Sequence, residues 1–302
     1  MRDALGNNAK WASTVTVITV LLLVAAKSVA YYLSDSAAVL SSLVDSVSDI
    51  GMSVMTWLSI RWSLKPADDD HRHGHGKIEA VAALFQSAVL TGAAFFLVFT
   101  AVGRFLQPVD TVNHLFTIAL MSLSLLSSAF LTFIQNRANR SGASLALQAD
   151  QAHYATDIWL NGIVIVVVML DYMNMSPVWF DPFCTVLIAG LFASAAYKIA
   201  RKSIHMLMDR EVEPAIRDRI SDIVTAPADV KGIHDLRVTR SGMKIVVSFD
   251  MEVDGNLTLC AAHEIAQEAE YRILREFPNA EILIHLDPEG EIEDSRHGEV
   301  IK

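Results

Sequence analysis

Two pairs of side chains that can ligate metal lie inside apolar stretches of the sequence, each with a spacing of four residues. Asp45 and Asp49 form one pair, and His153 and Asp157 form the other. Residues four apart lie on one face of a helix. An aspartate near the centre of a bilayer costs about 2.5–3.5 kcal/mol on insertion scales, so it requires a partner or an aqueous cavity. Three carboxylates and one imidazole suit a tetrahedral divalent ion such as Zn²⁺, with Cd²⁺ and Fe²⁺ as near neighbours.

This ligand set favours an exchangeable ion over a permanent structural zinc. The cysteines, Cys184 and Cys260, form no CxxC motif, so a thiolate zinc site is set aside. Ligands must lose their protons to bind metal, and an imidazole titrates near neutral pH, so exchange of metal for protons is a natural mechanism. The alternative is a structural ion-pair network, but Lys27 is one cation against three carboxylates. We interpret Asp150 as an entrance or helix-packing residue.

The elements that must position these pairs are membrane-spanning helices. Six apolar stretches are each long enough to cross about 30 Å of hydrocarbon. At 1.5 Å per residue, both pairs fall about 12–20 Å deep, near the midplane, so they can meet. The predicted spans are Trp11–Leu33, Ala37–Leu64, Ile78–Leu106, His114–Gln135, Ser144–Met173 and Trp179–Ala200.

The distribution of Lys and Arg orients these spans. The connections after the odd-numbered spans hold Arg104 alone. The positive-inside rule therefore places both termini in the cytoplasm. The flanks and the connections after even-numbered spans hold Arg2, Lys10, Arg61, Lys65, Arg72, Lys77, Arg137, Arg140, Lys198, Arg201 and Lys202.

The charge of the chain changes after Met208. Basic and acidic residues are equal in number up to this residue, and the entire net charge of −10 falls in the segment that follows. The sequence therefore predicts a membrane domain over residues 1–208, a cytoplasmic domain over 209–290 and a disordered tail over 291–302. The acidic domain argues against nucleic acid as a partner.

The cytoplasmic domain reads as a small α/β fold with helices on one face of a sheet. The segment 245–253 alternates between apolar and polar residues, as expected of a strand with one buried face. The predicted order is helix, strand, strand, helix and strand, at Glu213–Thr225, Ile233–Thr239, Ile245–Val253, Leu257–Phe277 and Glu281–Asp287.

The connection between the second and third spans, residues 65–77, carries a second candidate metal site. His71 and His75 are four residues apart and follow a run of aspartates that begins at Asp68. Two imidazoles and a carboxylate could hold a metal on a short helical turn. The alternative is a solvated loop whose histidines only raise the local metal concentration.

The motifs together resemble the cation diffusion facilitator family, in its bacterial zinc, cadmium and iron efflux branch. The resemblance rests on the DxxxD pair at Asp45 and Asp49, the HxxxD pair at His153 and Asp157, and the loop that begins at Pro66. It implies a homodimeric antiporter in the bacterial inner membrane that exports zinc, cadmium or ferrous iron against protons by alternating access. It also implies a ferredoxin-like, metallochaperone-like cytoplasmic domain, zinc as transported and regulatory ion, and no organic cofactor.

The resemblance also assigns residues outside the spans. It implies a salt bridge near the dimer seam between Lys77 and Asp209. Asp250 departs from the family, because a histidine is expected there; aspartate is still a competent zinc ligand. The implied loop ligands are Asp68, His71 and His75, and the implied cytoplasmic ligands are His234, Asp250, His263, His285 and Asp287.

Two other classes of function are weighed against transport. An intramembrane hydrolase would use an HExxH or GxGD motif, and the sequence contains neither, so the chain is not expected to be an enzyme. A membrane-anchored metal sensor or scaffold would bind metal without moving it, and transport in sealed vesicles separates it from an exporter.

Overall fold

The computed structural model describes residues 2–290 except 35–36, 108–113, 141–143, 174, 176 and 178. The chain divides into two compact units: a membrane unit, Asp3–Met208, and a C-terminal unit formed by Asp209–Lys302 with Met1–Arg2. The predicted disordered tail, residues 291–302, lies outside the described residues.

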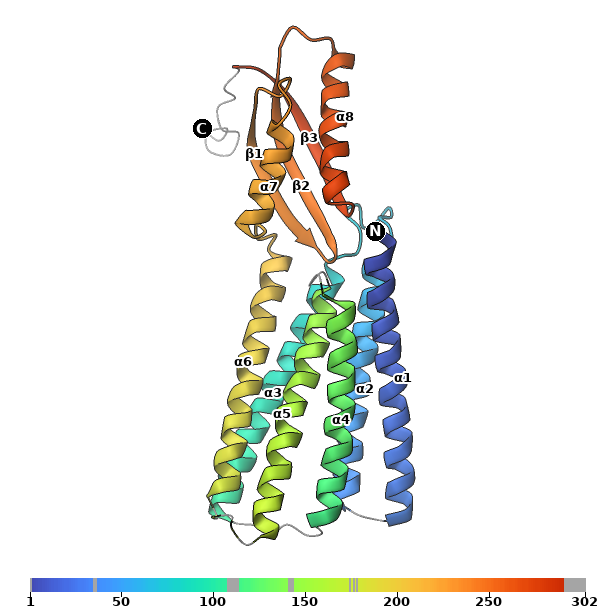
Figure 1. The fold of residues 1–302 in the computed structure, drawn as a ribbon, viewed down its shortest axis with the longest axis vertical. Coiled ribbons are helices and arrows are strands. Elements are labelled where there is room, and N and C mark those ends of the chain that lie inside the picture. Colours follow the sequence, from blue (N-terminus) through green and yellow to red (C-terminus); the bar gives the residue numbers. More distant parts are fainter. Residues whose placement is uncertain are drawn as a thin grey trace. The chain divides into compact units, whose positions relative to one another are not determined.

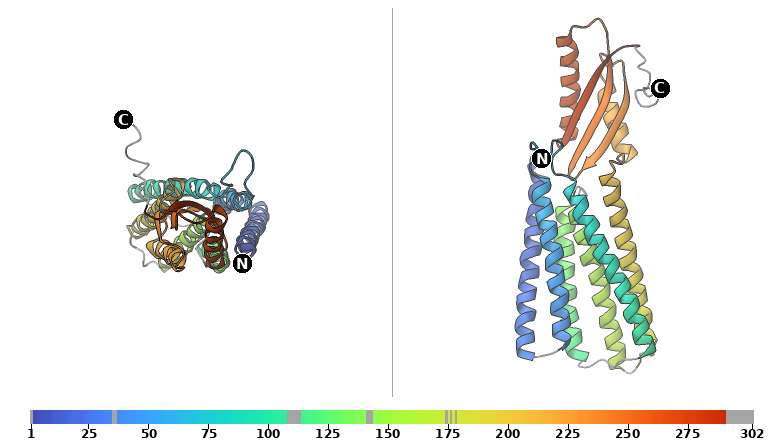
Figure 2. Two further views of the ribbon diagram at one scale, coloured as in Figure 1. Left: turned by 90° about the horizontal axis from the view of Figure 1, so that it is seen from above. Right: turned by 180° about the vertical axis from the view of Figure 1, so that it is seen from behind.

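Six long helices form the described part of the membrane unit and run alongside one another (Figures 1 and 2). The third and sixth helices pack closely along their length, as do the fourth and fifth. The second contacts the third and the fifth, which brings the two predicted ligand pairs onto neighbouring helices. The helices are α1 Arg2–Ser34, α2 Ala37–Ser63, α3 Ile78–Leu106, α4 His114–Ala138, α5 Leu145–Tyr172 and α6 Phe180–Leu207.

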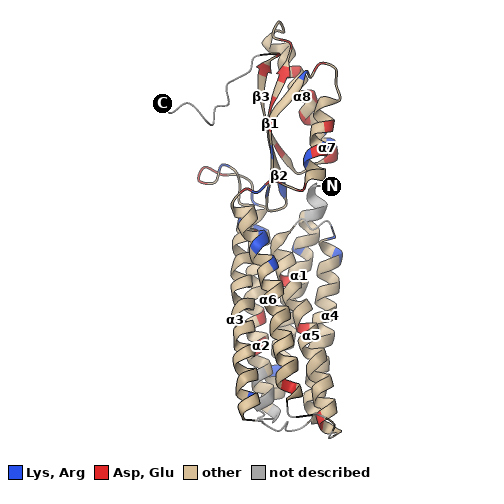
Figure 3. Ribbon diagram, turned by 90° about the vertical axis from the view of Figure 1, so that its left-hand side faces the viewer, with Lys and Arg blue, Asp and Glu red and all other residues tan. Residues whose placement is uncertain are grey.

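The outer surface of this unit is apolar and much of its interior is small or polar. Phe95, Phe96 and Phe99 of α3 expose 68–78% of their surface, whereas Ala80 and Ala83 of the same helix are completely buried. Small residues let helices approach closely, and large apolar residues on the outside suit contact with lipid. Figure 3 shows how sparse Lys, Arg, Asp and Glu are along these helices.

Five of the described helices are long and apolar enough to cross a membrane, and α2 is not among them. The helix α2 has 27 residues, enough to span about 40 Å, but Asp45, Asp49 and its serines lower its hydropathy. A membrane protein with five apolar candidate spans is therefore supported. The sixth span stays a prediction.

The C-terminal unit contains a three-stranded sheet with the order β1-β2-β3. The first two strands pair antiparallel and the last two pair parallel. Two helices, α7 and α8, pack against each other over the sheet (Figure 1), so the predicted small α/β domain is confirmed. The elements are α7 Pro214–Thr225, β1 Gly232–Ser241, β2 Lys244–Val253, α8 Leu259–Glu276 and β3 Ala280–Pro288.

The core of this unit follows from the alternation in β2. Val247, Phe249 and Met251 are 0–2% exposed and pack with Ile220 of α7 and Ile273 of α8. Burying side chains of this size contributes about 1.5–3 kcal/mol each. Successive side chains of a strand point to opposite faces, so the intervening polar residues of β2 face away from the helices. Four of the five cytoplasmic candidate ligands lie on the strands, on that polar side: His234, Asp250, His285 and Asp287.

Candidate metal centre

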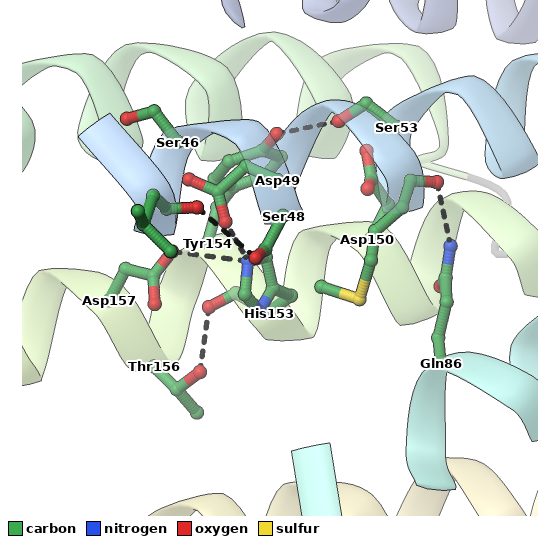
Figure 4. A network of polar contacts seen from close by, with 12 residues as sticks. Ser46, Ser48, Asp49, Ser53, Gln86, Asp150, His153, Tyr154, Thr156 and Asp157 are labelled. Atoms are coloured by element: carbon green, nitrogen blue, oxygen red, sulfur yellow. Dashed lines mark hydrogen bonds and ion pairs between the residues drawn. The ribbon is translucent and has the colours of Figure 1, made fainter. Parts of the chain in front are cut away.

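Three of the four predicted membrane ligands converge between α2 and α5 (Figure 4). The Nε2 atom of His153 lies 3.0 Å from Oδ1 of Asp49 and 3.4 Å from Oδ2 of Asp157. One ligand atom from each of the three residues lies within 4.8 Å of the others. Their side chains are only 11–25% exposed. This is the geometry of a site in which a cation can replace the proton shared by an imidazole and two carboxylates.

Neighbouring polar groups fix the helix faces that carry these ligands. The hydroxyl groups of Ser53 on α2 and Tyr154 on α5 form a 2.6 Å hydrogen bond next to the centre. The side chain of Thr156 donates to the backbone oxygen of His153, and Asn161 donates to that of Asp157. Packing and hydrogen bonds of this kind hold ligands in register before an ion arrives.

Asp45 lies apart from the other three ligands. Its side chain is exposed, and it is not part of the cluster formed by Asp49, His153 and Asp157. The four-residue cage expected from spacing is therefore a three-residue cluster with a carboxylate one turn away on α2. A charged residue within a membrane helix needs a charged partner or water.

Asp150 pairs with an amide instead of joining the cluster. Its Oδ2 atom accepts a 2.6 Å hydrogen bond from Nε2 of Gln135 on α4, and Gln135 also donates to Thr16 of α1. Asp150 is 1% exposed. Its contacts join α1, α4 and α5, which fits the interpretation of a helix-packing residue. Hydropathy alone gave no signal for Gln135.

Glu79 is a buried carboxylate that spacing did not single out. It opens α3 directly after the loop and accepts hydrogen bonds from Ser63 at 2.8 Å and from Ser144 at 2.7 Å. It is 0% exposed. It therefore ties the end of α2 and the start of α5 to the segment that follows the loop. The sequence feature that could have pointed to Glu79 was its position in the first turn of α3, directly after a histidine-rich loop.

The loop ligands come together, but residues 65–77 form turns and bends and not the short helical turn that the spacing predicted. Oδ1 of Asp68 lies 3.2 Å from Nδ1 of His71, and Oδ2 lies 3.3 Å from Nε2 of His75. The backbone N–H of His71 donates to Asp68 at 2.7 Å, and this hydrogen bond holds the pKa of Asp68 below its usual value. An ionised carboxylate between two imidazoles can share a divalent cation with them.

In the C-terminal unit three predicted ligands meet on three different strands. His234 of β1 lies directly opposite Asp250 of β2 in the antiparallel register. Its Nε2 atom is 3.7 Å from Oδ2 of Asp250 and 3.2 Å from Oδ2 of Asp287 on β3. The aspartate at position 250 therefore occupies a ligand position in this cluster.

Two more residues lie next to this cluster, His285 and Glu252. Nε2 of His285 is 3.2 Å from Oδ1 of Asp287, so this carboxylate lies between two imidazoles. His263 on α8 is exposed and lies outside the cluster of described residues. Glu252 was not predicted; its Oε1 atom is 3.3 Å from Nδ1 of His234. Glu252 lies two residues after Asp250 on β2. Side chains two residues apart on a strand face the same side of the sheet, so this spacing could have identified Glu252 from the sequence.

The predicted pair of Lys77 and Asp209 is divided between the two units. Lys77 directly precedes α3, and Asp209 follows α6 with a left-handed backbone, φ 49°. This salt bridge stays a prediction.

Comparison with known proteins agrees with this architecture. Residues 13–208 match the cation efflux transmembrane domain, and residues 212–289 match the cation efflux protein cytoplasmic domain. The chain is 37% identical over 279 residues to the cation-efflux pump FieF of Shewanella oneidensis, covering 92% of this chain and 94% of that protein. It is 34% identical over 277 residues to the cation-efflux pump FieF of Salmonella arizonae, covering 92% and 91%.

Solved structures of related domains are also similar to part of the chain. The metal-bound C-terminal domain of the CzcD transporter from Thermotoga maritima is 27% identical over 27% of this chain and 100% of its own, with a TM-score of 0.26.

Proposed function

The chain belongs to the cation efflux, or cation diffusion facilitator, family, and we propose that it exports zinc from the cytoplasm in exchange for protons. The observation that carries this proposal is the convergence of Asp49, His153 and Asp157 between α2 and α5. These are one imidazole and two carboxylates inside a unit with an apolar exterior. The set suits Zn²⁺, and Cd²⁺ and Fe²⁺ fit the same geometry.

The proposed transport step is a competition between metal and protons for the same atoms. Metal requires a neutral His153 and ionised Asp49 and Asp157. Protons arriving from the outer side occupy these atoms and release the metal outward. Because the ligands come from two helices, a shift of α2 against α5 would open the cluster alternately to each side. We propose α2 as the sixth span, with both termini in the cytoplasm of a bacterial inner membrane.

The loop and the C-terminal unit have different proposed roles. Asp68, His71 and His75 would collect metal from the cytoplasm, since the side chains of Asp68 and His71 are more than half exposed. The cluster of His234, Asp250 and Asp287 would bind regulatory zinc, in a unit that matches the family's cytoplasmic domain. We propose that this unit forms a homodimer, as the family resemblance implies.

Flux of metal into proteoliposomes tests the transport proposal. Wild type, Asp157→Ala and the control Asp171→Asn would be compared with Zn²⁺, Cd²⁺ and Fe²⁺ under an imposed pH gradient. Asp171 is a suitable control because it lies on the same helix but pairs with His114, away from the cluster. We expect Asp157→Ala to reduce zinc flux at least 100-fold and Asp171→Asn to change it less than twofold.

Two results would reject the proposal. Undiminished flux in Asp157→Ala would refute the site assignment. A wild type that binds zinc but moves none would identify a metal sensor or scaffold instead of an exporter.

A further inference from the structure

Lys27 is a buried cation inside the membrane unit that the proposed transport step does not use. It is 5% exposed. Its Nζ atom donates to the backbone oxygen of Ser42 at 3.2 Å, to Oγ of Ser46 at 2.7 Å and to Oγ of Ser124 at 3.3 Å. Lysine is rarely buried without a charged partner, and in a membrane it marks functional sites. Lys27 therefore requires an explanation beyond packing.

The hydrogen bonds of Lys27 leave the metal ligands free. Within the described part of the chain, its three acceptors are neutral oxygens of α2 and α4. The ammonium nonetheless lies near the carboxylates of α2, because its acceptor Ser46 is one residue from Asp45 and three residues from Asp49. A direct salt bridge would occupy a ligand oxygen. The serines instead hold the ammonium beside the cluster, where it acts through its field alone.

The charges of this region balance when a divalent ion is bound. Asp45, Asp49 and Asp157 contribute three negative charges, and Lys27 contributes one positive charge. A divalent cation beside a neutral His153 brings the sum to zero. A neutral loaded state has the smallest cost in a medium of low dielectric. Without Lys27, the empty site would carry three negative charges instead of a net two, so it would attract a divalent cation more strongly.

We propose that Lys27 is a fixed counter-charge that sets the metal affinity of the membrane cluster. The ammonium repels the incoming cation and so weakens its binding, which favours release in the transport cycle. In this role Lys27 places a positive charge near the cluster and does not contact the metal. The consequence for release rests on the proposed export function, but the effect on affinity does not.

Zinc binding to the full-length protein in detergent tests this role. The dissociation constant of zinc at the membrane cluster would be measured by calorimetry at pH 8, where protons compete less with the metal. All variants would also carry His71→Ala and Asp287→Ala, which remove zinc binding at the other two clusters. We expect Lys27→Gln to tighten zinc binding about tenfold, because it removes a positive charge near the bound cation. Lys27→Arg, which keeps the charge, should stay within twofold of wild type.

Two controls separate charge from structure. Lys202→Gln removes an exposed lysine of the same unit that donates to Gln148, and it should leave zinc affinity unchanged. Ser46→Ala and Ser124→Ala each remove one acceptor without changing charge; they should lower thermal stability and leave affinity within twofold.

The outcomes are distinct. Tighter binding in Lys27→Gln alone supports the proposal. Unchanged or weaker zinc binding in Lys27→Gln overturns the proposal. The proposal is also overturned if neither Lys27→Gln nor a second neutral variant, Lys27→Met, folds, because Lys27 would then only hold α1, α2 and α4 together. If wild type moves no zinc in vesicles but Lys27→Gln still binds more tightly, the export proposal fails while this one stands.

Discussion

The membrane unit and the C-terminal unit each gather one histidine and two aspartates, but on different kinds of element. In the membrane unit, Asp49 comes from one helix and His153 with Asp157 from another. Helices joined by side chains alone can shift against each other. In the C-terminal unit, each ligand lies on a different strand, and the backbone ladder fixes their register. The first arrangement suits an ion that must be released, and the second suits an ion that is retained.

The two clusters also differ in their contact with water. The membrane histidine exposes 11% of its side chain, whereas His234 exposes 39%. The C-terminal cluster can therefore equilibrate directly with dissolved metal, whereas the metal needs a path through the protein to reach the membrane cluster. This difference predicts that damage to the two clusters has unequal effects on transport.

The largest expected effect follows from His153→Ala. The Nε2 atom of His153 is the atom that meets both carboxylates, and its loss leaves Asp49 and Asp157 facing each other without a nitrogen ligand. We expect zinc affinity of the membrane cluster to fall at least 100-fold, with loss of flux in proteoliposomes. His114→Ala, which removes a histidine paired with Asp171, is the matched control. Equal losses in both variants would contradict the assignment of the cluster.

An intermediate effect is expected from Asp287→Asn. This carboxylate lies 3.2 Å from both His234 and His285, so the change should weaken zinc binding to the C-terminal unit about tenfold. Flux should fall severalfold without disappearing, because the membrane cluster is intact. Asp254→Asn, at the end of β2, provides the control. Flux in Asp287→Asn equal to that of wild type would argue against a regulatory role for this cluster.

The smallest effect concerns the pH stability of the C-terminal unit. Arg219 of α7 and Glu276 of α8 form a bidentate, exposed pair at 2.7–3.0 Å. Hydrogen bonding to Arg219 lowers the pKa of Glu276. A carboxyl group with a lowered folded pKa adds stability above its unfolded pKa, and this stability is lost as the pH falls through the folded value.

Glu276→Gln should therefore lower the melting temperature of this unit slightly at pH 7 and not at pH 3. Differential scanning calorimetry at both pH values checks this expectation, with Glu264→Gln on the same helix as control. Exposed ion pairs contribute little, so a large shift at pH 7 would show that this pair does more than join α7 to α8.

The sequence was sufficient for the family, the ligand types and the local geometry of each pair. His153 and Asp157 share a helix face because the helical period is 3.6 residues. The polar side of β2 could be predicted because side chains alternate between the two faces of a strand. These are local rules, and the structure agrees with them at the cluster of Asp49, His153 and Asp157 and at the cluster of His234, Asp250 and Asp287.

The sequence alone did not predict the contacts between helices. The exposure of Asp45, the pairing of Gln135 with Asp150 and the serine cradle of Lys27 all depend on how helices rotate and pack against each other. That rotation is set by many small contacts across the bundle, and no single spacing in the chain encodes it. Residue types and periods thus specify which side chains can bind metal, whereas packing selects those that meet, because distance between helices is a property of the whole bundle.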